Sequence, residues 1–271
     1  MKRYLYAALL CVGLGTALVS CKKNKDDNNS DLNLAKDQAD AELIYNDVAT
    51  MADLAAAGNT LYRFDPVSAT NFKIVRDTTF QPVKLTIDFG KVSVACKDGR
   101  SRRGKIVIEY YGNYNTLNQN HSISFVDYAV DNNDASGTIT STNIGPNNYS
   151  QTVFNMIFNG QVRKASNGNS YTWNAQRTRE VIAGYTTSDP TDDVYLLSGK
   201  ASGIMEDGTT EYTDKIINKL KRNFNCSWNY QGVTTVYPKN RVACEMHYAS
   251  EACSNKVTIY VDQKGTEQTI Q

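Results

Sequence analysis

The most basic segment of the chain is residues 96–105, which reads CKDGRSRRGK. Beside Lys97, it contains four cationic side chains that could act together: Arg100, Arg102, Arg103 and Lys105. A cluster of this kind can bind an anionic sugar or a phosphate, because guanidinium groups match such anions with paired hydrogen bonds. The same side chains can instead surround the Asp98-Gly99 turn and pair with nearby carboxylates, which is the more common use of surface charge. We predict the structural role and keep the ligand patch as the alternative.

Three carboxylates lie within residues 189–193, which read DPTDD and precede a predicted strand. They are Asp189, Asp192 and Asp193. Loop oxygens suit Ca²⁺, but the segment lacks the glycine and the terminal glutamate of an EF-hand loop. A turn capped by aspartate side chains explains the same residues, so we predict a turn and keep calcium as the alternative. Because the chain has nearly balanced charge, we also expect Arg103 to pair with Asp192 or Asp193.

Aromatic and cationic side chains alternate along residues 171–183. The side chains on one face of this predicted strand are Tyr171, Trp173, Arg177 and Arg179. Such a stripe can stack on sugar rings or hold a uronate, and it can equally form a cross-strand ladder inside a sheet. We favour the ladder.

No nucleophile and base pair can be assigned from the sequence. His121 and His247 have no identifiable Ser, Cys or Asp partner. A glycosidase needs two carboxylates across a cleft, and Glu109 and Glu180, both inside predicted strands, are the candidates to test. We expect no catalytic residue and no cofactor.

The cysteines beyond the first 21 residues number four, which suits disulfides in an oxidising compartment. They are Cys96, Cys226, Cys244 and Cys253. Zinc would need a second closely spaced ligand pair besides Cys244 and His247, so we expect no metal. If the hairpin that follows Cys226 turns near residue 235, Cys226 lies opposite Cys244, which is the more natural geometry for a disulfide. If it turns at 238–240, Cys253 is the rival partner.

The apolar pattern changes its period once along the chain. Ile44, Val48, Met51 and Ala55 share one helical face, which predicts a packing helix over residues 31–58. From residue 59 to 271 the period is two, with strands expected at 84–89, 105–110, 121–130, 137–143, 152–158, 171–183, 194–201, 224–230, 241–248 and 257–261. We predict a mostly β fold, an antiparallel β-sandwich or an extended twisted meander that follows one N-terminal α-helix, in one domain or two β subdomains.

The N-terminus has the pattern of a bacterial export signal. A basic start precedes a mainly apolar run over residues 5–19, which is too short for a lasting membrane span. Small and apolar residues then lead to Cys21, whose thiol can receive a diacylglycerol. The pattern predicts a signal peptide over 1–20, lipidation of Cys21 and a flexible tether over 21–30.

The segment LVSC at residues 18–21, followed by Lys25, Asp26 and Asp27, resembles the lipoproteins of Bacteroidota. In those proteins a lysine and acidic residues just beyond the lipidated cysteine act as a surface-export signal. The resemblance implies a lipid anchor in the outer membrane and a body that faces outward. It covers only about the first 27 residues and implies nothing about the activity of the rest.

Charge excludes some partners. Without residues 1–20 the chain has 27 basic and 28 acidic side chains, because Lys2 and Arg3 leave with the signal. This balance gives no field that would hold nucleic acid, so membrane contact depends on the lipid. We predict a noncatalytic binding or structural module of the cell envelope, with a glycan or an envelope protein as partner. The alternative is a glycan-active hydrolase of the cell surface.

Overall fold

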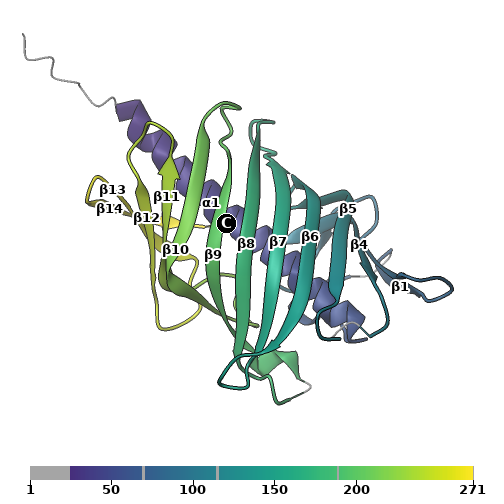
Figure 1. Cartoon of the computed structure of the whole chain (residues 1–271). Coiled ribbons are helices and arrows are strands. Elements are labelled where there is room, and N and C mark those ends of the chain that lie inside the picture. The colour runs from purple at the N-terminus through teal and green to yellow at the C-terminus, as the bar shows by residue number, and fades with distance from the viewer. Residues whose placement is uncertain (1–24, 69–70, 114–115, 188, 271) are drawn as a thin grey trace, which may run out of the picture.

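The protein is described by a computed structural model over residues 25–68, 71–113, 116–187 and 189–270, with side chains from residue 31 (Figure 1). It consists of one long helix, α1 (Lys25–Ala56), followed by an antiparallel meander (Figure 1). Of the two predicted architectures, the meander is therefore confirmed and the sandwich is not formed. The predicted signal peptide and Cys21 lie outside the described residues.

The meander runs through thirteen strands in chain order, with each strand paired to the next on the path. They are β1 (Lys73–Asp77), β2 (Val83–Asp88), β4 (Ser101–Tyr110), β5 (Asn120–Val130), β6 (Asn133–Pro146), β7 (Thr152–Arg163), β8 (Ser170–Ala183), β9 (Val194–Ile204), β10 (Glu211–Asn223), β11 (Gln231–Pro238), β12 (Cys244–Ala249), β13 (Lys256–Val261) and β14 (Lys264–Thr269). The short strand β3 (Val94–Ala95) pairs with β4 beside this path. Among the described strands β1 and β14 do not pair with each other, so the sheet is open.

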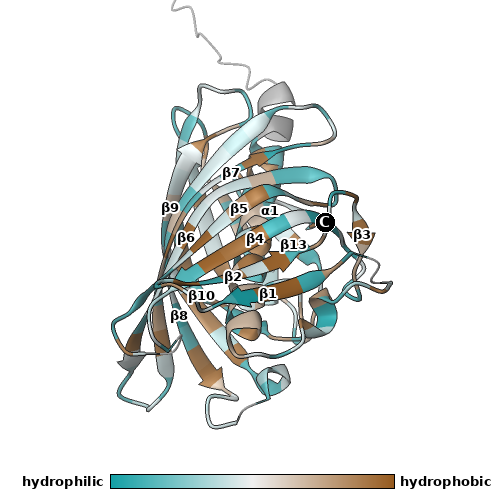
Figure 2. Ribbon diagram, turned by 90° about the vertical axis from the view of Figure 1, so that its right-hand side faces the viewer, coloured by the Kyte–Doolittle hydropathy of each residue, from teal (hydrophilic) through white to brown (hydrophobic). Residues whose placement is uncertain are grey.

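The sheet curls around α1, which lies along its inner side (Figures 1 and 2). The curl is accompanied by bulges, where the pairing register shifts between neighbouring strands, as in β5 with β6 and β9 with β10. Such bulges bend a strand and increase its twist. The helix is therefore covered on most of its surface, and Ile44, Val48 and Met51 are all at most 3% exposed. The predicted role of this helix in packing is confirmed.

The helix approaches the middle of the sheet through Tyr45. Its ring stacks on Trp173 with centroids 5.5 Å apart, and its hydroxyl donates to the backbone oxygens of Ser136 (2.8 Å) and Gln161 (3.1 Å). A Cβ at Gly160 would lie 2.3 Å from Cζ of Tyr45. A side chain at that position would push the helix away, so Gly160 fixes the distance between α1 and the sheet.

The helix begins at Lys25, six residues earlier than predicted and inside the segment expected to be a tether. Charged and amide side chains fill its first turns, which hid this part from an apolar pattern. Among the described residues no helix has the length and apolar character needed to cross a bilayer.

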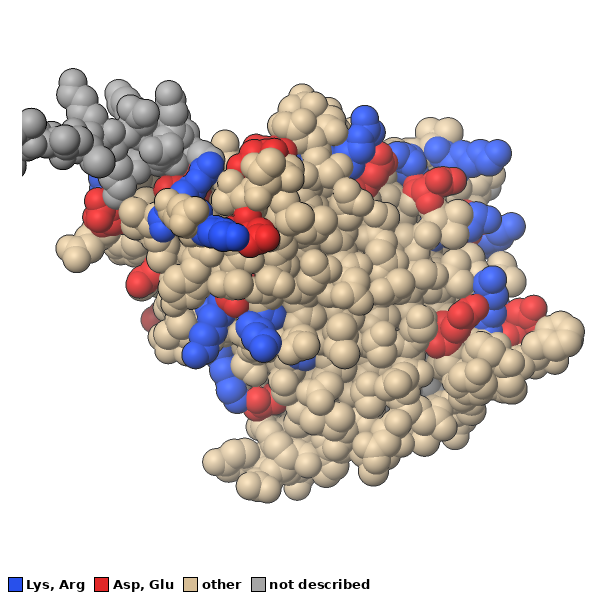
Figure 3. Space-filling model, turned by 45° about the horizontal axis from the view of Figure 1, so that its top comes forward, with Lys and Arg blue, Asp and Glu red and all other residues tan. Residues whose placement is uncertain are grey.

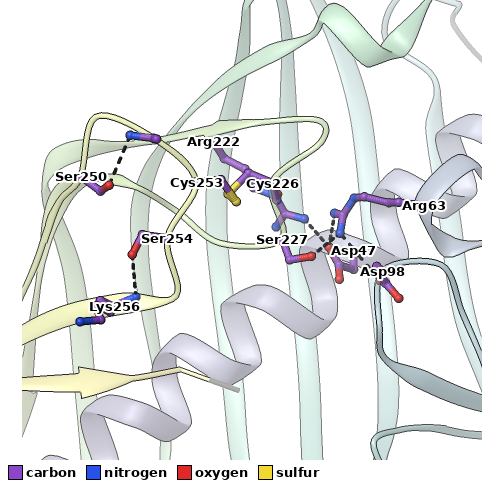
Figure 4. The surroundings of a disulfide bond; sticks show 11 residues. Asp47, Arg63, Asp98, Arg222, Cys226, Ser227, Ser250, Cys253, Ser254 and Lys256 are labelled. Atoms are coloured by element: carbon purple, nitrogen blue, oxygen red, sulfur yellow. Dashed lines mark hydrogen bonds and ion pairs between the residues drawn. A yellow bond between two sulfur atoms is a disulfide. The ribbon is translucent and has the colours of Figure 1, made fainter.

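The prediction of a strand over residues 224–230 is wrong. The segment is a loop, and the hairpin that follows it is formed by β11 and β12, with its turn at 239–243. This is the second of the two predicted registers. Cys226 accordingly forms a disulfide with Cys253 rather than with Cys244, which stays a buried free thiol, as does Cys96 (Figure 4).

Candidate functional site

Acidic side chains lie at intervals along α1 and point to different sides of it, and basic side chains of the surrounding sheet or its loops meet them. The close pairs are Asp37 with Lys164 (2.7 Å), Glu42 with Arg177 (2.7 Å), Asp47 with Arg63 (2.9 Å) and Asp53 with Arg179 (2.6 Å). Buried charges are tolerated when they are paired and hydrogen-bonded. The helix is thus held by ion pairs as well as by apolar packing.

The densest of these contacts is the Asp47 cluster, which we define as Asp47 and Asp98 with the guanidinium groups of Arg63, Arg100, Arg102 and Arg222. The Asp47 side chain is 2% exposed. Burial alone would raise the pKa of Asp47, but the four guanidiniums outweigh burial and lower this pKa to about 2. Asp47 is therefore ionised at physiological pH and ties α1 to three separate parts of the chain: η1 (Tyr62–Phe64), the start of β4 and the end of β10.

The disulfide completes this cluster (Figure 4). It fixes the loop of residues 224–230, from which the Cys226 backbone oxygen accepts a hydrogen bond from Nε of Arg222 at 3.1 Å. The neighbouring Ser227 hydroxyl accepts a hydrogen bond from Arg63 (Figure 4). The Cys226–Cys253 bond therefore holds in place two acceptors that the arginines need.

The aromatic and cationic stripe on β8 faces α1. Tyr171, Trp173 and Arg177 are each at most 3% exposed, and Arg177 pairs with both Glu42 and Asp214. The predicted alternation is confirmed, and these side chains form part of the interior. Only Arg179, near the end of the strand, reaches an open cavity.

That cavity, which we call the terminal cleft, lies beside the C-terminal end of α1 and the ends of neighbouring strands. It has a volume of about 500 Å³. Its lining includes Asp53, Asn143, Phe154, Arg179, Asp193 and Tyr195. These residues come from α1, from the ends of β6, β7 and β8, and from the loop and strand that follow β8, so the meander brings together positions up to 142 residues apart.

Charge in the terminal cleft is arranged in two hydrogen-bonded pairs. Arg179 Nη2 lies 2.6 Å from Oδ2 of Asp53, and its guanidinium carbon lies 4.6 Å from the ring centroid of Phe154. The Tyr195 hydroxyl donates to Oδ2 of Asp193 at 2.9 Å. Burial, with the neighbouring Asp192 and Asp53 charges, outweighs this hydrogen bond and Arg179 and raises the pKa of Asp193 to about 6.

In the loop after β8, the backbone packs closely against Asp193. Gly184 has φ +81°, and an added Cβ would lie 2.2 Å from Oδ1 of Asp193. A glycine is therefore needed where β8 turns towards the short helix η2 (Pro190–Asp192). Beside it, the Tyr185 ring is 40% exposed, and it lines the cleft. The cleft thus offers carboxylate, amide, guanidinium and phenol groups beside aromatic surfaces.

The basic segment at 96–105 is divided between the interior and the surface. Arg100 pairs with Asp131 at 2.7 Å, and the fully buried Arg102 pairs with Asp98 at 2.7 Å. Lys105 pairs with Asp88 at 3.0 Å. These contacts are the carboxylate pairing that the structural reading predicts.

The predicted partner of Arg103 is wrong. Arg103 pairs with Asp134 at the start of β6 and donates to the backbone oxygen of Asp127 at 2.9 Å, and neither Asp192 nor Asp193 meets it. The error arises because β4, β5 and β6 are neighbours in the sheet, which places Asp134 two strands away from Arg103. Asp192 and Asp193 lie near the terminal cleft instead.

The three aspartates at 189–193 make separate contacts. Asp189 caps η2 by accepting from the amide of Thr191 at 2.9 Å, as an aspartate-capped turn does. Asp192 accepts from the Thr187 hydroxyl at 3.0 Å, and Asp193 accepts from Tyr195. Over the described part of the chain, no group of three His, Cys, Asp or Glu side chains is arranged to hold a metal ion.

The glutamates and histidines that were candidates for catalysis are not brought together. Glu109 is exposed on β4, and Glu180 on β8 pairs with Lys219 at 2.5 Å. His121 is buried beside the Tyr110 ring, with centroids 6.2 Å apart, whereas His247 lies 2.9 Å from Glu245 on β12. None of the four lines the terminal cleft.

Sequence reasoning missed Asp47, Asp53 and Tyr195 as interacting groups, and it assigned Asp193 to a turn and to Arg103 instead of to the cleft. For Asp47 a signal was present, because it lies three residues after Ile44 and four before Met51, inside the apolar face of the helix. A carboxylate in such a face needs a buried partner. For Asp53 and Asp193 the sequence has no comparable signal, since they meet only through the path of the meander.

Comparison with known proteins gives no relative. No protein family, no curated protein and no solved structure matches the chain.

Proposed function

We propose that the protein is a lipid-anchored, noncatalytic binding module of the cell envelope that holds a neutral, hydroxyl-rich ligand, a saccharide, in the terminal cleft. The observation that carries the proposal is the cleft itself, a cavity of about 500 Å³ that combines aromatic surfaces with hydrogen-bonding groups. Ligand sites in proteins have this size and this mixture of apolar walls and a few placed polar groups.

The chemistry of the lining favours a neutral ligand. Arg179, the cation in the described lining, is already paired with Asp53, so the cleft offers no free positive charge to an anionic ligand. Carboxylates, amides and a phenol can accept and donate hydrogen bonds to sugar hydroxyls. The half-exposed ring of Tyr185 provides a flat surface on which the apolar face of a sugar ring can stack.

The direction of α1 suits an anchored receptor. The helix begins four residues after Cys21, and its N-terminal end projects from the body (Figure 1). Asp53 and Leu54, near its other end, line the cleft. From residue 25 to residue 53 a straight helix extends about 42 Å. An anchor at Cys21 therefore leaves the cleft at the far end of the helix from the membrane.

The ligand proposal is tested by screening the full chain, purified in detergent, against an array of neutral oligosaccharides. Tyr185→Ala should reduce binding to the positive glycans at least tenfold, because a sugar–aromatic contact is lost, while leaving the melting temperature unchanged. Tyr237→Ala is the matched control, since Tyr237 on β11 is similarly exposed (45%) and lies outside the cleft. Equal loss in both variants would place the saccharide elsewhere.

Anchoring is tested by labelling cells with an alkyne fatty acid. The wild-type chain should be labelled and Cys21→Ala should not be. Continued labelling of Cys21→Ala would contradict the lipid anchor. Protease treatment of intact cells then separates an outward-facing body, which is cleaved, from one that faces the periplasm.

A second candidate, a glycan-active hydrolase, is favoured by one observation: two carboxylates, Asp53 and Asp193, line the same cleft. In such an enzyme Asp193, with its pKa raised to about 6, would supply the proton and Asp53 would be the second carboxylate. Release of reducing sugar from a bound glycan, abolished by Asp193→Asn, would replace the noncatalytic proposal. Binding without release supports it.

A further inference from the structure

A second cavity lies at the start of β4 and differs in charge from the terminal cleft. It has a volume of about 1010 Å³ and is formed by β1, the loop between β2 and β3, the start of β4 and the middle of β5. Four cationic side chains line it: Lys73, Lys91, Arg103 and Lys105. We call it the basic groove, and we propose that it binds an acidic saccharide, a sugar chain that carries carboxylate or sulfate groups.

The charges in the groove do not cancel. Its lining includes two carboxylates, Asp88 and Asp127, against the four cations. Asp88 is already occupied, since it lies 3.0 Å from Nζ of Lys105 and accepts from the amide of Gly90 at 2.9 Å. Even with Asp134, which pairs with Arg103 from outside the lining, four cations face three carboxylates. An anion entering the groove therefore meets an excess of positive charge, although the whole chain is nearly neutral.

Two of the cations are available to a ligand. Lys73 and Lys91 are exposed, and among the described residues neither makes an ion pair within 4.0 Å. Arg103, in contrast, is held by Asp134 and by the backbone oxygen of Asp127. Arg103 and Lys105 are thus held by carboxylates. The ammonium groups of Lys73, which lies opposite Asp88 in the β1–β2 pairing, and of Lys91 are exposed to a ligand.

The groove wall is preorganised. The amide of Gly104 donates to the backbone oxygen of Gly90 at 2.7 Å, and the amide of Phe89 donates to the backbone oxygen of Gly104 at 2.9 Å. These two bonds fasten the loop after β2 to the bulge in β4. A wall that does not need to be ordered on binding costs the ligand less free energy.

The volume of the basic groove and the apolar side chains at its rim favour a sugar chain over a free anion. A volume of about 1010 Å³ exceeds the space that a single phosphate needs. Val92 (77% exposed) and Val126 (46% exposed) line the same groove and offer apolar contact to the CH faces of sugar rings. The one aromatic ring in the lining, Phe89, is fully buried, so the groove lacks the stacking surface that single-stranded nucleic acid uses.

The test is calorimetric titration of the full chain in detergent with trigalacturonate, a sulfated dextran oligomer, maltotriose and inorganic phosphate. At least one of the two anionic saccharides should bind at low salt and lose affinity at high salt, because screening weakens charge attraction. Maltotriose and phosphate should not compete with it. Competition by phosphate at equal concentration would reduce the groove to a general anion site and overturn the proposal.

The double variant Lys73→Gln/Lys91→Gln should lower this affinity at least tenfold. The matched control is Lys200→Gln/Lys215→Gln, which removes two exposed cross-strand lysines from β9 and β10, outside the groove. An equal loss in the control, or binding by neither anionic saccharide, would contradict the proposal. Tyr185→Ala should leave binding of the acidic saccharide unchanged, so this inference and the neutral-saccharide proposal for the terminal cleft fail independently.

Discussion

Asp47 and Asp53 are two aspartates on one helix, and each meets arginine from the surrounding sheet, yet their surroundings differ. Asp47 is 2% exposed and is enclosed by four guanidiniums, with a disulfide-bound loop behind them (Figure 4). Asp53 is 30% exposed, meets Arg179 and lines a cavity of about 500 Å³. Asp47 and its arginines stabilise the fold, whereas Asp53 and Arg179 lie where a ligand can reach them.

Residue type alone therefore does not distinguish a charged side chain that stabilises the fold from one that can bind a ligand. What separates them is whether water and ligands have access. On the face drawn in Figure 3 the charged side chains gather near the periphery and leave an uncharged area in the middle. Substitutions at the two sites and at the surface test this division.

The largest effect is expected at Asp47. Asp47→Ala removes the central carboxylate and leaves buried guanidiniums without their shared partner, which should lower the free energy of unfolding by about 3–5 kcal/mol. Asp53→Ala should cost only about 1–2 kcal/mol, because water in the cleft can solvate Arg179. Urea unfolding of both variants measures the difference. Equal losses would remove the distinction between the two sites.

The disulfide should contribute nearly as much. Cys253→Ser opens a loop of 27 residues, for which chain entropy predicts a loss of about 3.5 kcal/mol. Wild-type protein in reductant should lose the same amount, and the variant should lose nothing further. A variant as stable as the wild type would mean that the loop at 224–230 holds its place beside Arg222 without the disulfide.

A pH dependence is expected from Asp40. Burial, and secondarily the charge of Asp37, raises its pKa to about 7, so ionised Asp40 costs folding free energy that protonated Asp40 does not. This cost is absent below about pH 4 and grows as pH rises to about 7. Asp40→Asn should therefore stabilise the protein by about 1–2 kcal/mol at pH 8 and change little at pH 4. Thermal melts at the two pH values measure this, and equal shifts at both would contradict it.

The smallest effect is expected at the open surface. Arg103 and Asp134 are 31% and 41% exposed, so Arg103→Ala should lower the free energy of unfolding by only about 0.2–1 kcal/mol. A double-mutant cycle with Asp134→Ala isolates the pair. A coupling above about 2 kcal/mol would place this pair with the buried cluster instead of with solvent-exposed pairs.

Much of the fold could be predicted because the spacing of apolar residues indicates which side chains are buried. The change from a helical to an alternating pattern predicts one helix and a run of strands, and both are present. The same rule failed at 224–230, where Phe224, Cys226 and Tyr230 alternate and are each at most 7% exposed. There the burial comes from a loop pinned by a disulfide, which alternation cannot distinguish from a strand.

Less of the candidate sites could be predicted, because they depend on which strands meet. Arg103 and Lys105 were identified from charge density alone, but Lys73 and Lys91 join them only through the pairing of β1 with β2 and of β2 with β4. Asp53 and Asp193 are 140 residues apart and meet because the meander returns to the end of α1. Local sequence contains no information on such contacts.

Hydrogen–deuterium exchange of the full chain with and without a glycan that the array identifies tests the central claim most directly. If the terminal cleft is the binding site, the amides of residues 143–152 and 184–195 should exchange more slowly with the glycan present, and those around the Asp47 cluster should not change. Protection confined to the outer face around Tyr237, with none in the cleft segments, would contradict the claim.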